Sequence, residues 1–154
     1  MKTTVKAKVA TLDMFINGAF VKSKDGSTRE ICDPADGTVL ARVPEASRAD
    51  AQSAIAAARA AFDQGPWRAT SAQDRGKLLL KIGDLIRANA QALAQLEVRN
   101  MGKPLAEAEF DVADAANCFE FYGGLATKIH GETMSVPANS MSFVVREPVG
   151  VCAQ

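Results

Sequence analysis

Residues 104–130 read PLAEAEFDVADAANCFEFYGGLATKIH, and their spacing predicts one long helix around which the fold is organised. Proline suits the first helical position because it loses no useful N–H there, and the acidic side chains that follow favour the positive end of the helix dipole. Apolar residues recur at steps of three and four, so they should form one stripe facing a core. The stripe consists of Leu105, Ala108, Val112, Ala115, Phe119, Tyr122, Ala126 and Ile129.

Two acids within this helix form a candidate binding feature. Asp111 and Asp114 are three residues apart, so their carboxylates share one flank of the helix, with Phe110 beside them. Two acids and an aromatic ring can seat a cation. The same residues also fit a solvated acidic face near a helix start, and two carboxylates give little selectivity for a divalent metal. Spacing alone leaves these alternatives open.

Upstream of this helix, the sequence predicts two β-hairpins and then three shorter helices. Asn17-Gly18, at the centre of residues 14–21, suits the positive φ angles of a type I′ turn. Residues 30–33 and 38–43 form the second hairpin through a turn that contains proline and glycine. The helix starts are marked by Ser47 with Asp50, by Ser71 with Asp74 and by Asn89, and Gly102 ends the last helix.

Downstream of the helix, we expect a loop over 131–140, a β-branched strand over 142–146 and a last apolar run over 149–153. The last run does not alternate, which suits a strand buried on both faces of a parallel sheet. Such a strand needs a crossover and a neighbour, and no residues follow to form them. We therefore expect an unfinished sheet with exposed apolar surface around 149–153.

Composition restricts the class of protein. The 154 residues are 47% apolar and 23% charged, which is globular, and one domain is the default at this length. A formal net charge of +0 gives no electrostatic case for nucleic acid or an anionic membrane. The chain lacks both a membrane-spanning apolar run and a secretory apolar segment, so we expect a cytoplasmic protein. Three distant cysteines without a CxxC pair disfavour disulfides and zinc.

Residues that could carry catalysis are few. His130 is the single histidine, and a surface or helix-end role is favoured for it over catalysis. Gly123-Gly124 lacks the strand-to-helix context of a phosphate loop, so close packing is the better interpretation. We assign no catalytic and no cofactor-binding residue to this chain.

Six segments, taken in order, resemble the N-terminal part of an NAD(P)-dependent aldehyde dehydrogenase: 15–18, 33–37, 57–62, 101–104, 121–124 and 146–151. Each segment alone is a weakly specific match, but the order and spacing of all six together are highly specific. The resemblance implies an α/β fold, with N-terminal β-hairpins and a helical layer of a Rossmann-type domain, truncated at the first strands of the oligomerisation and coenzyme sheets. Its parts would be a flexible terminus (1–13), the N-terminal part of the coenzyme-binding domain (14–140), an oligomerisation strand (141–148) and the start of the parallel sheet (149–154).

Within that family, residues 102–105 and 110–114 resemble the betaine aldehyde and aminoaldehyde dehydrogenase group. The resemblance implies that Asp111 and Asp114 attract the cationic end of the aldehyde, and that Phe110 lines the substrate tunnel where the group usually has Trp. It also implies a monovalent cation site at the Ile31 carbonyl and Asn100. The family usually has Asp at the second position, and Asn keeps an oxygen ligand without its charge.

The implied activity is oxidation of amino- or betaine-type aldehydes to carboxylates with NAD or NADP. The family's catalytic Cys and general-base Glu match motifs beyond Gln154, so we expect this chain alone to be inactive and to hold no cofactor. The resemblance also implies a homo-oligomer that forms through Met141–Val151. The alternative is a non-catalytic module that self-associates or pairs with a full-length aldehyde dehydrogenase subunit.

Overall fold

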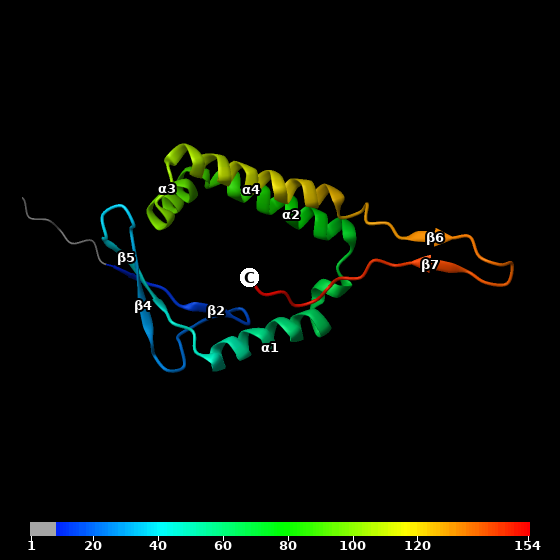
Figure 1. The fold of residues 1–154 in the computed structure, drawn as a ribbon, viewed down its shortest axis with the longest axis horizontal. Coiled ribbons are helices and arrows are strands. Elements are labelled where there is room, and N and C mark those ends of the chain that lie inside the picture. The colour runs from blue at the N-terminus through cyan, green and yellow to red at the C-terminus, as the bar shows by residue number, and fades with distance from the viewer. Residues whose placement is uncertain (1–8) are drawn as a thin grey trace, which may run out of the picture.

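The computed structural model describes residues 9–154, which contain short strands and a layer of helices (Figure 1). The strands are β1 (Ala10–Thr11), β2 (Met14–Ile16), β3 (Ala19–Val21), β4 (Thr28–Cys32), β5 (Val39–Pro44), β6 (Glu132–Met134) and β7 (Ser142–Val144). The helices are α1 (Arg48–Gln64), α2 (Ala72–Ala88), α3 (Ala90–Met101) and α4 (Leu105–Leu125), with a 3-10 turn η1 (Pro66–Ala69) between the first two.

The two predicted hairpins are confirmed. β2 and β3 pair antiparallel across Asn17 and Gly18, whose φ angles of 53° and 77° are those that a type I′ turn needs. β4 pairs antiparallel with β5, and β1 joins the other edge of β5 in parallel, with Ala10 opposite Ala41. β1 falls within the terminus (1–13) that was predicted to be flexible, and it pairs with β5 there; residues 1–8 lie outside the described part.

The start of α1 is held by a buried carboxylate. Ser47 caps the helix in a complete capping box with Asp50, as the sequence predicts. The Oδ2 atom of Asp50 also accepts hydrogen bonds from the Ser23 hydroxyl (3.1 Å) and the Lys24 N–H (3.3 Å), which ties the end of the first hairpin to the helix. These donors, the Ser47 hydroxyl first among them, lower the pKa of Asp50 to about 2.

The other predicted helix boundaries are confirmed in part. The Ser71 hydroxyl accepts a hydrogen bond from the Asp74 N–H at the start of α2, and Gly102 ends α3 with a φ of 76°. Asn89 stands between α2 and α3, but its side chain donates to the Leu85 carbonyl at 2.8 Å and caps no N–H of α3. Its side chain therefore satisfies the end of α2 rather than the start of α3.

The centre of the helical layer is the contact between α2 and α4, which run side by side (Figure 1). A Cβ atom on Gly76 of α2 would lie 2.7 Å from the Gly123 carbonyl oxygen of α4, so the backbones nearly touch there. Ala108 and Ala116 are buried on the same side of α4. The predicted stripe is thus wrong in detail, because small residues allow the close approach, whereas Leu105 and Tyr122 are exposed.

The chain after α4 also differs from the sequence prediction. α4 ends at Leu125 and not near His130, because two glycines weaken its last turns and the Lys128 ammonium bonds the Gly124 carbonyl. Part of the predicted loop forms β6, which pairs with β7. Residues 149–153 form no strand, because no other described strand pairs with them. Val149 is 94% exposed, which matches the apolar surface expected there.

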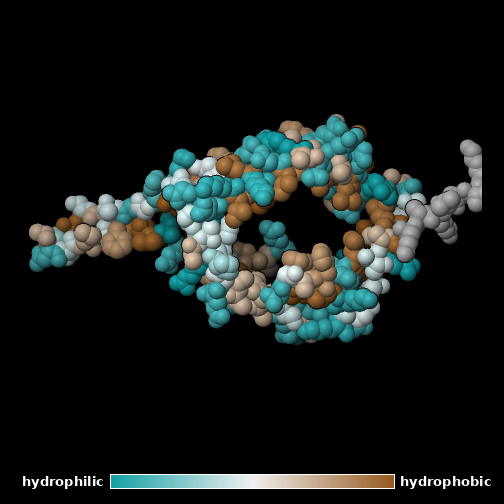
Figure 2. Space-filling model, turned by 180° about the vertical axis from the view of Figure 1, so that it is seen from behind, coloured by the Kyte–Doolittle hydropathy of each residue, from teal (hydrophilic) through white to brown (hydrophobic). Residues whose placement is uncertain are grey.

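The described residues enclose a hollow rather than a filled core. The surface of the chain measures 12391 Å², whereas a compact protein of this mass exposes about 7,500 Å². The only fully buried apolar side chains among residues 9–154 are Ala94, Ala108 and Ala116. Apolar atoms border the central hollow (Figure 2), and the C-terminal end runs toward it (Figure 1). The helices and hairpins therefore present apolar faces that residues 9–154 leave uncovered.

Candidate functional site

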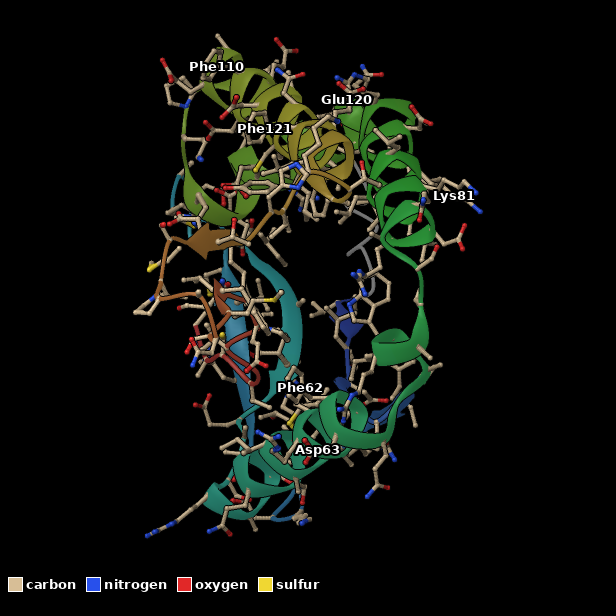
Figure 3. The ribbon with its side chains drawn as sticks, turned by 90° about the vertical axis from the view of Figure 1, so that its right-hand side faces the viewer. Phe62, Asp63, Lys81, Phe110, Glu120 and Phe121 are labelled. Carbon is tan, nitrogen blue, oxygen red and sulfur yellow. The ribbon has the colours of Figure 1, made fainter. Side chains whose placement is uncertain are left out.

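The predicted substrate residues lie on the first turns of α4, on the side away from α2. At about 100° per residue, Phe110 and Asp114 lie opposite Ala116 and Gly123, the residues that pack on α2. Phe110 is 67% exposed, and its ring stands at the start of α4 (Figure 3). The structure therefore brings the aromatic ring and the two acids to one open face of the helix.

Asp111 is paired with a lysine that the sequence prediction did not include. The Lys103 Nζ atom lies 2.5 Å from Asp111 Oδ2 and 2.9 Å from Glu97 Oε1, and the lysine side chain is 28% exposed. Its hydrogen bonds to Asp111 first and Glu97 second raise the pKa of Lys103, so the ammonium stays charged at neutral pH. The open face thus includes a bridged cluster of one cation and two anions, called here the Lys103 cluster.

Asp114 differs from Asp111 in its partners. No ion pair or side-chain hydrogen bond joins Asp114 to any other residue between 9 and 154, and it is exposed. Of the predicted pair, Asp111 thus forms an ion pair, whereas the Asp114 carboxylate has no partner among residues 9–154. An open carboxylate next to an exposed aromatic ring can attract a cation by charge and through the ring face.

The segments predicted for a monovalent cation site lie near each other. Ile31 is in β4, directly before an irregularity in its pairing with β5, and Asn100 is exposed near the end of α3. A Cβ atom on Gly102 would lie 2.7 Å from the Pro34 side chain, so the end of α3 meets the turn that follows β4. The site itself stays a prediction.

The remaining candidate residues from the sequence are the possible metal ligands, the two glycines of α4 and His130. Between residues 9 and 154, no three His, Cys, Asp or Glu side chains lie where they could hold a metal ion. Gly123 and Gly124 lie inside α4, where Gly123 packs against Gly76. His130 follows the helix, and its carbonyl accepts a bond from the Arg146 Nε at 3.1 Å. The close packing that the sequence predicts for these glycines is confirmed at Gly123.

The part of the site that sequence reasoning missed is Lys103 with Glu97. Both residues precede α4, and the turn at Gly102 decides which side chains of α3 and α4 meet. A lysine eight residues before Asp111 has no helical spacing that would signal the pair.

Among the described residues, no helix combines the length and apolar character required to cross a bilayer.

Comparison with known proteins gives a consistent result. The model of the aldehyde dehydrogenase family matches residues 20–154. Betaine aldehyde dehydrogenase of Bacillus subtilis (strain 168) is 45% identical over 92% of this chain and 29% of that protein. An aldehyde dehydrogenase of Aspergillus niger is 41% identical over 93% of this chain and 29% of that protein.

Solved structures agree with the sequence comparison. Aldehyde dehydrogenase from Bacillus cereus, in its NAD+ complex, has a TM-score of 0.86 and 38% identity, and the match covers 90% of this chain and 28% of that chain. A point mutant of betaine aldehyde dehydrogenase from Staphylococcus aureus, in complex with NAD+, has a TM-score of 0.79 and 38% identity, covering 83% of this chain and 26% of that one. This chain thus spans less than a third of these relatives, and it belongs to the aldehyde dehydrogenase family, whose N-terminal part its fold matches.

Proposed function

We propose that this chain supplies part of an aldehyde dehydrogenase that oxidises amino- or betaine-type aldehydes to carboxylates with NAD or NADP. Phe110, Asp111 and Asp114 would form part of the wall along which the aldehyde enters. The observation that carries this proposal is the open face of α4, where an exposed ring stands beside acidic side chains. The similarity to proteins named betaine aldehyde dehydrogenase supports the substrate class.

These side chains would supply specificity and not chemistry. A trimethylammonium or ammonium group is attracted by a nearby carboxylate, and contact with an aromatic face adds about 0.5–2 kcal/mol. Residues 9–154 include no glycine-rich strand-to-helix turn that could hold cofactor phosphates. The reacting groups would come from other parts of the enzyme, and this chain alone would be inactive.

The substrate class can be tested in a hybrid enzyme. Residues 20–154 would replace the matching segment of the Bacillus subtilis betaine aldehyde dehydrogenase. The kcat/KM for betaine aldehyde would be compared with that for 3,3-dimethylbutanal, a neutral aldehyde of the same shape. The double variant D111N/D114N should lower the ratio of the two values about tenfold, or ~1.4 kcal/mol, because both carboxylate charges are removed.

A matched control for this test lies on the same helix. Glu109 is exposed on the other flank of α4, so Glu109→Gln removes one acid without altering the proposed wall. Its ratio for the two aldehydes should stay unchanged. If the double variant keeps the ratio of the unsubstituted hybrid, the proposed substrate class is wrong.

The second candidate function is pairing with other subunits through Met141–Val151. β6 and β7 project from the body as a two-stranded hairpin (Figure 1), and Phe143 is 62% exposed on it. An apolar strand with a free edge favours addition to another sheet. We propose residues 141–148 as the oligomerisation strand and 14–140 as the N-terminal part of the coenzyme-binding domain. Sedimentation with and without a full-length subunit tests the pairing, and a monomer that ignores that subunit contradicts it.

A further inference from the structure

We propose that Lys103 decides which acid on α4 recognises a cationic aldehyde: it occupies Asp111 and leaves recognition to Asp114. This inference rests on the proposed function and deepens it, because it assigns unequal roles to two carboxylates of the same wall. Lys103 is a positioning residue in this view, since it acts through Asp111 and not on the aldehyde.

The location of Lys103 fixes its ammonium group between two helices. Lys103 lies in the corner between α3 and α4, after Gly102 in a left-handed conformation and before Pro104, whose φ is fixed by its ring. Nζ contacts Glu97 on α3 and Asp111 on α4 at 2.9 and 2.5 Å. The lysine is the least exposed member of the cluster, at 28%. Its charge therefore stays beside Asp111.

The contacts separate the two acids. The Lys103 ammonium is hydrogen-bonded to Asp111 Oδ2 at 2.5 Å, so an approaching cation cannot take that contact and is also repelled by the ammonium, while the cluster as a whole keeps one net negative charge. The attraction between two charges weakens with distance, so an acid that a cation cannot contact directly contributes less than one that it can. Asp114 has no such partner among residues 9–154, and its full charge acts on an approaching cation.

The position of Phe110 favours the same acid. Asp114 follows Phe110 by four residues, so the two side chains are neighbours along the open face of α4. Asp111 lies on the flank of that face that meets α3, where Lys103 bonds it. A cation that contacts the exposed ring of Phe110 therefore meets Asp114 as its unpaired counter-charge.

The test uses the full 154-residue chain and choline, which carries the same trimethylammonium group. Binding is followed by NMR shifts of the α4 amides at constant ionic strength, with 3,3-dimethylbutan-1-ol as the neutral molecule of equal shape. Asp114→Asn should weaken choline binding about three- to fivefold, a change typical of one exposed charge pair, whereas Asp111→Asn should change it less than twofold. Neither variant should alter binding of the neutral alcohol.

The lysine itself is tested by a double-mutant cycle. Lys103→Met should tighten choline binding about threefold, because it releases the charge of Asp111, and in that background Asp111→Asn should weaken binding as strongly as Asp114→Asn does. Lys103→Arg keeps the charge and should keep the original pattern. Lys81→Met is the control for overall charge, because Lys81 points away from the hollow on α2 (Figure 3).

Several outcomes would decide against the inference. If Asp111→Asn weakens choline binding as much as Asp114→Asn while Lys103 is present, the assigned division is wrong, and this comparison holds even if Lys103→Met does not fold. An Lys103→Met variant that is folded by its amide spectrum and binds choline no more tightly also overturns it. If removing both acids leaves choline binding unchanged, the proposed substrate class has failed instead.

Discussion

The α2–α4 pair and the C-terminal arm of β6, β7 and residues 149–154 differ in how their surfaces are covered. In the helix pair, backbone meets backbone at Gly76 and Gly123, and Arg87 of α2 bonds Asn117 and Glu120 of α4 at 2.9 and 2.8 Å. In the arm, β6 pairs with β7, and large apolar side chains such as Phe143 and Val149 are exposed. The contact between α2 and α4 is thus filled by residues of this chain, whereas the arm has large apolar side chains that residues 9–154 leave uncovered.

This difference explains why the arm and the acidic wall are the parts to which we assign function. A packed contact determines stability, and a change there acts through the fold. An exposed apolar strand or an open carboxylate contributes little to the stability of this chain and is available to a partner or a ligand.

The largest effect is expected from Gly76→Ala at the helix crossing. The new Cβ would meet the Gly123 carbonyl oxygen at 2.7 Å, so the helices must separate, and overpacking of this kind costs about 1–3 kcal/mol. Gly124→Ala is the matched control, because a Cβ there meets nothing within 4 Å and alanine favours a helix by roughly 0.5–1 kcal/mol. Urea unfolding measures both. A Gly76→Ala variant as stable as the parent would show that α2 and α4 are not in close contact.

An intermediate effect is expected from acid at Asp50, the buried carboxylate at the start of α1. Because its pKa is lowered from 3.8 to about 2 in the folded chain, its contribution is complete above the higher value and is lost as the pH falls through the lower one. The melting temperature, measured by thermal unfolding between pH 5 and pH 2, should thus fall less steeply with decreasing pH for Asp50→Asn than for the parent. Asp84→Asn, an exposed acid of α2, should leave the decline unchanged.

The smallest effect on stability is expected from Phe143→Ser in the arm. The ring is exposed, and among the described strands β7 pairs with β6 alone, so the free energy of unfolding should change by no more than about 0.5 kcal/mol. Self-association measured by sedimentation should nevertheless decrease, because an apolar contact is removed. A Phe143→Ser variant that unfolds much more easily would mean that the arm packs against its own body.

The sequence predicted local elements well and their contacts less well. The turn at Asn17-Gly18, the capping box of Ser47 and the stop at Gly102 depend on backbone preferences within a few residues, and all three are confirmed. The extension of the last helix to His130 was wrong because apolar spacing continues past the two glycines that weaken it. Residues 149–153, expected to begin a parallel sheet, form no strand in this chain, since pairing requires a neighbour that periodicity cannot supply.

The candidate site was likewise predicted in its local part and not in its tertiary contacts. Its residue types and their spacing placed Asp111, Asp114 and Phe110 on one helix face, because helical geometry is a local property. That Lys103 bonds Asp111 while Asp114 stays open depends on the corner between α3 and α4, which brings Glu97 to the same point.

The sequence by itself determined the turns, the caps, the family and the open acidic helix, since each depends on neighbours along the chain or on motifs in fixed order. Only the tertiary structure decided that α2 and α4 meet through glycine, that a lysine neutralises one acid, and that apolar faces surround a hollow. The physical reason is that these features depend on distances between segments far apart in the chain, which packing sets and periodicity does not encode.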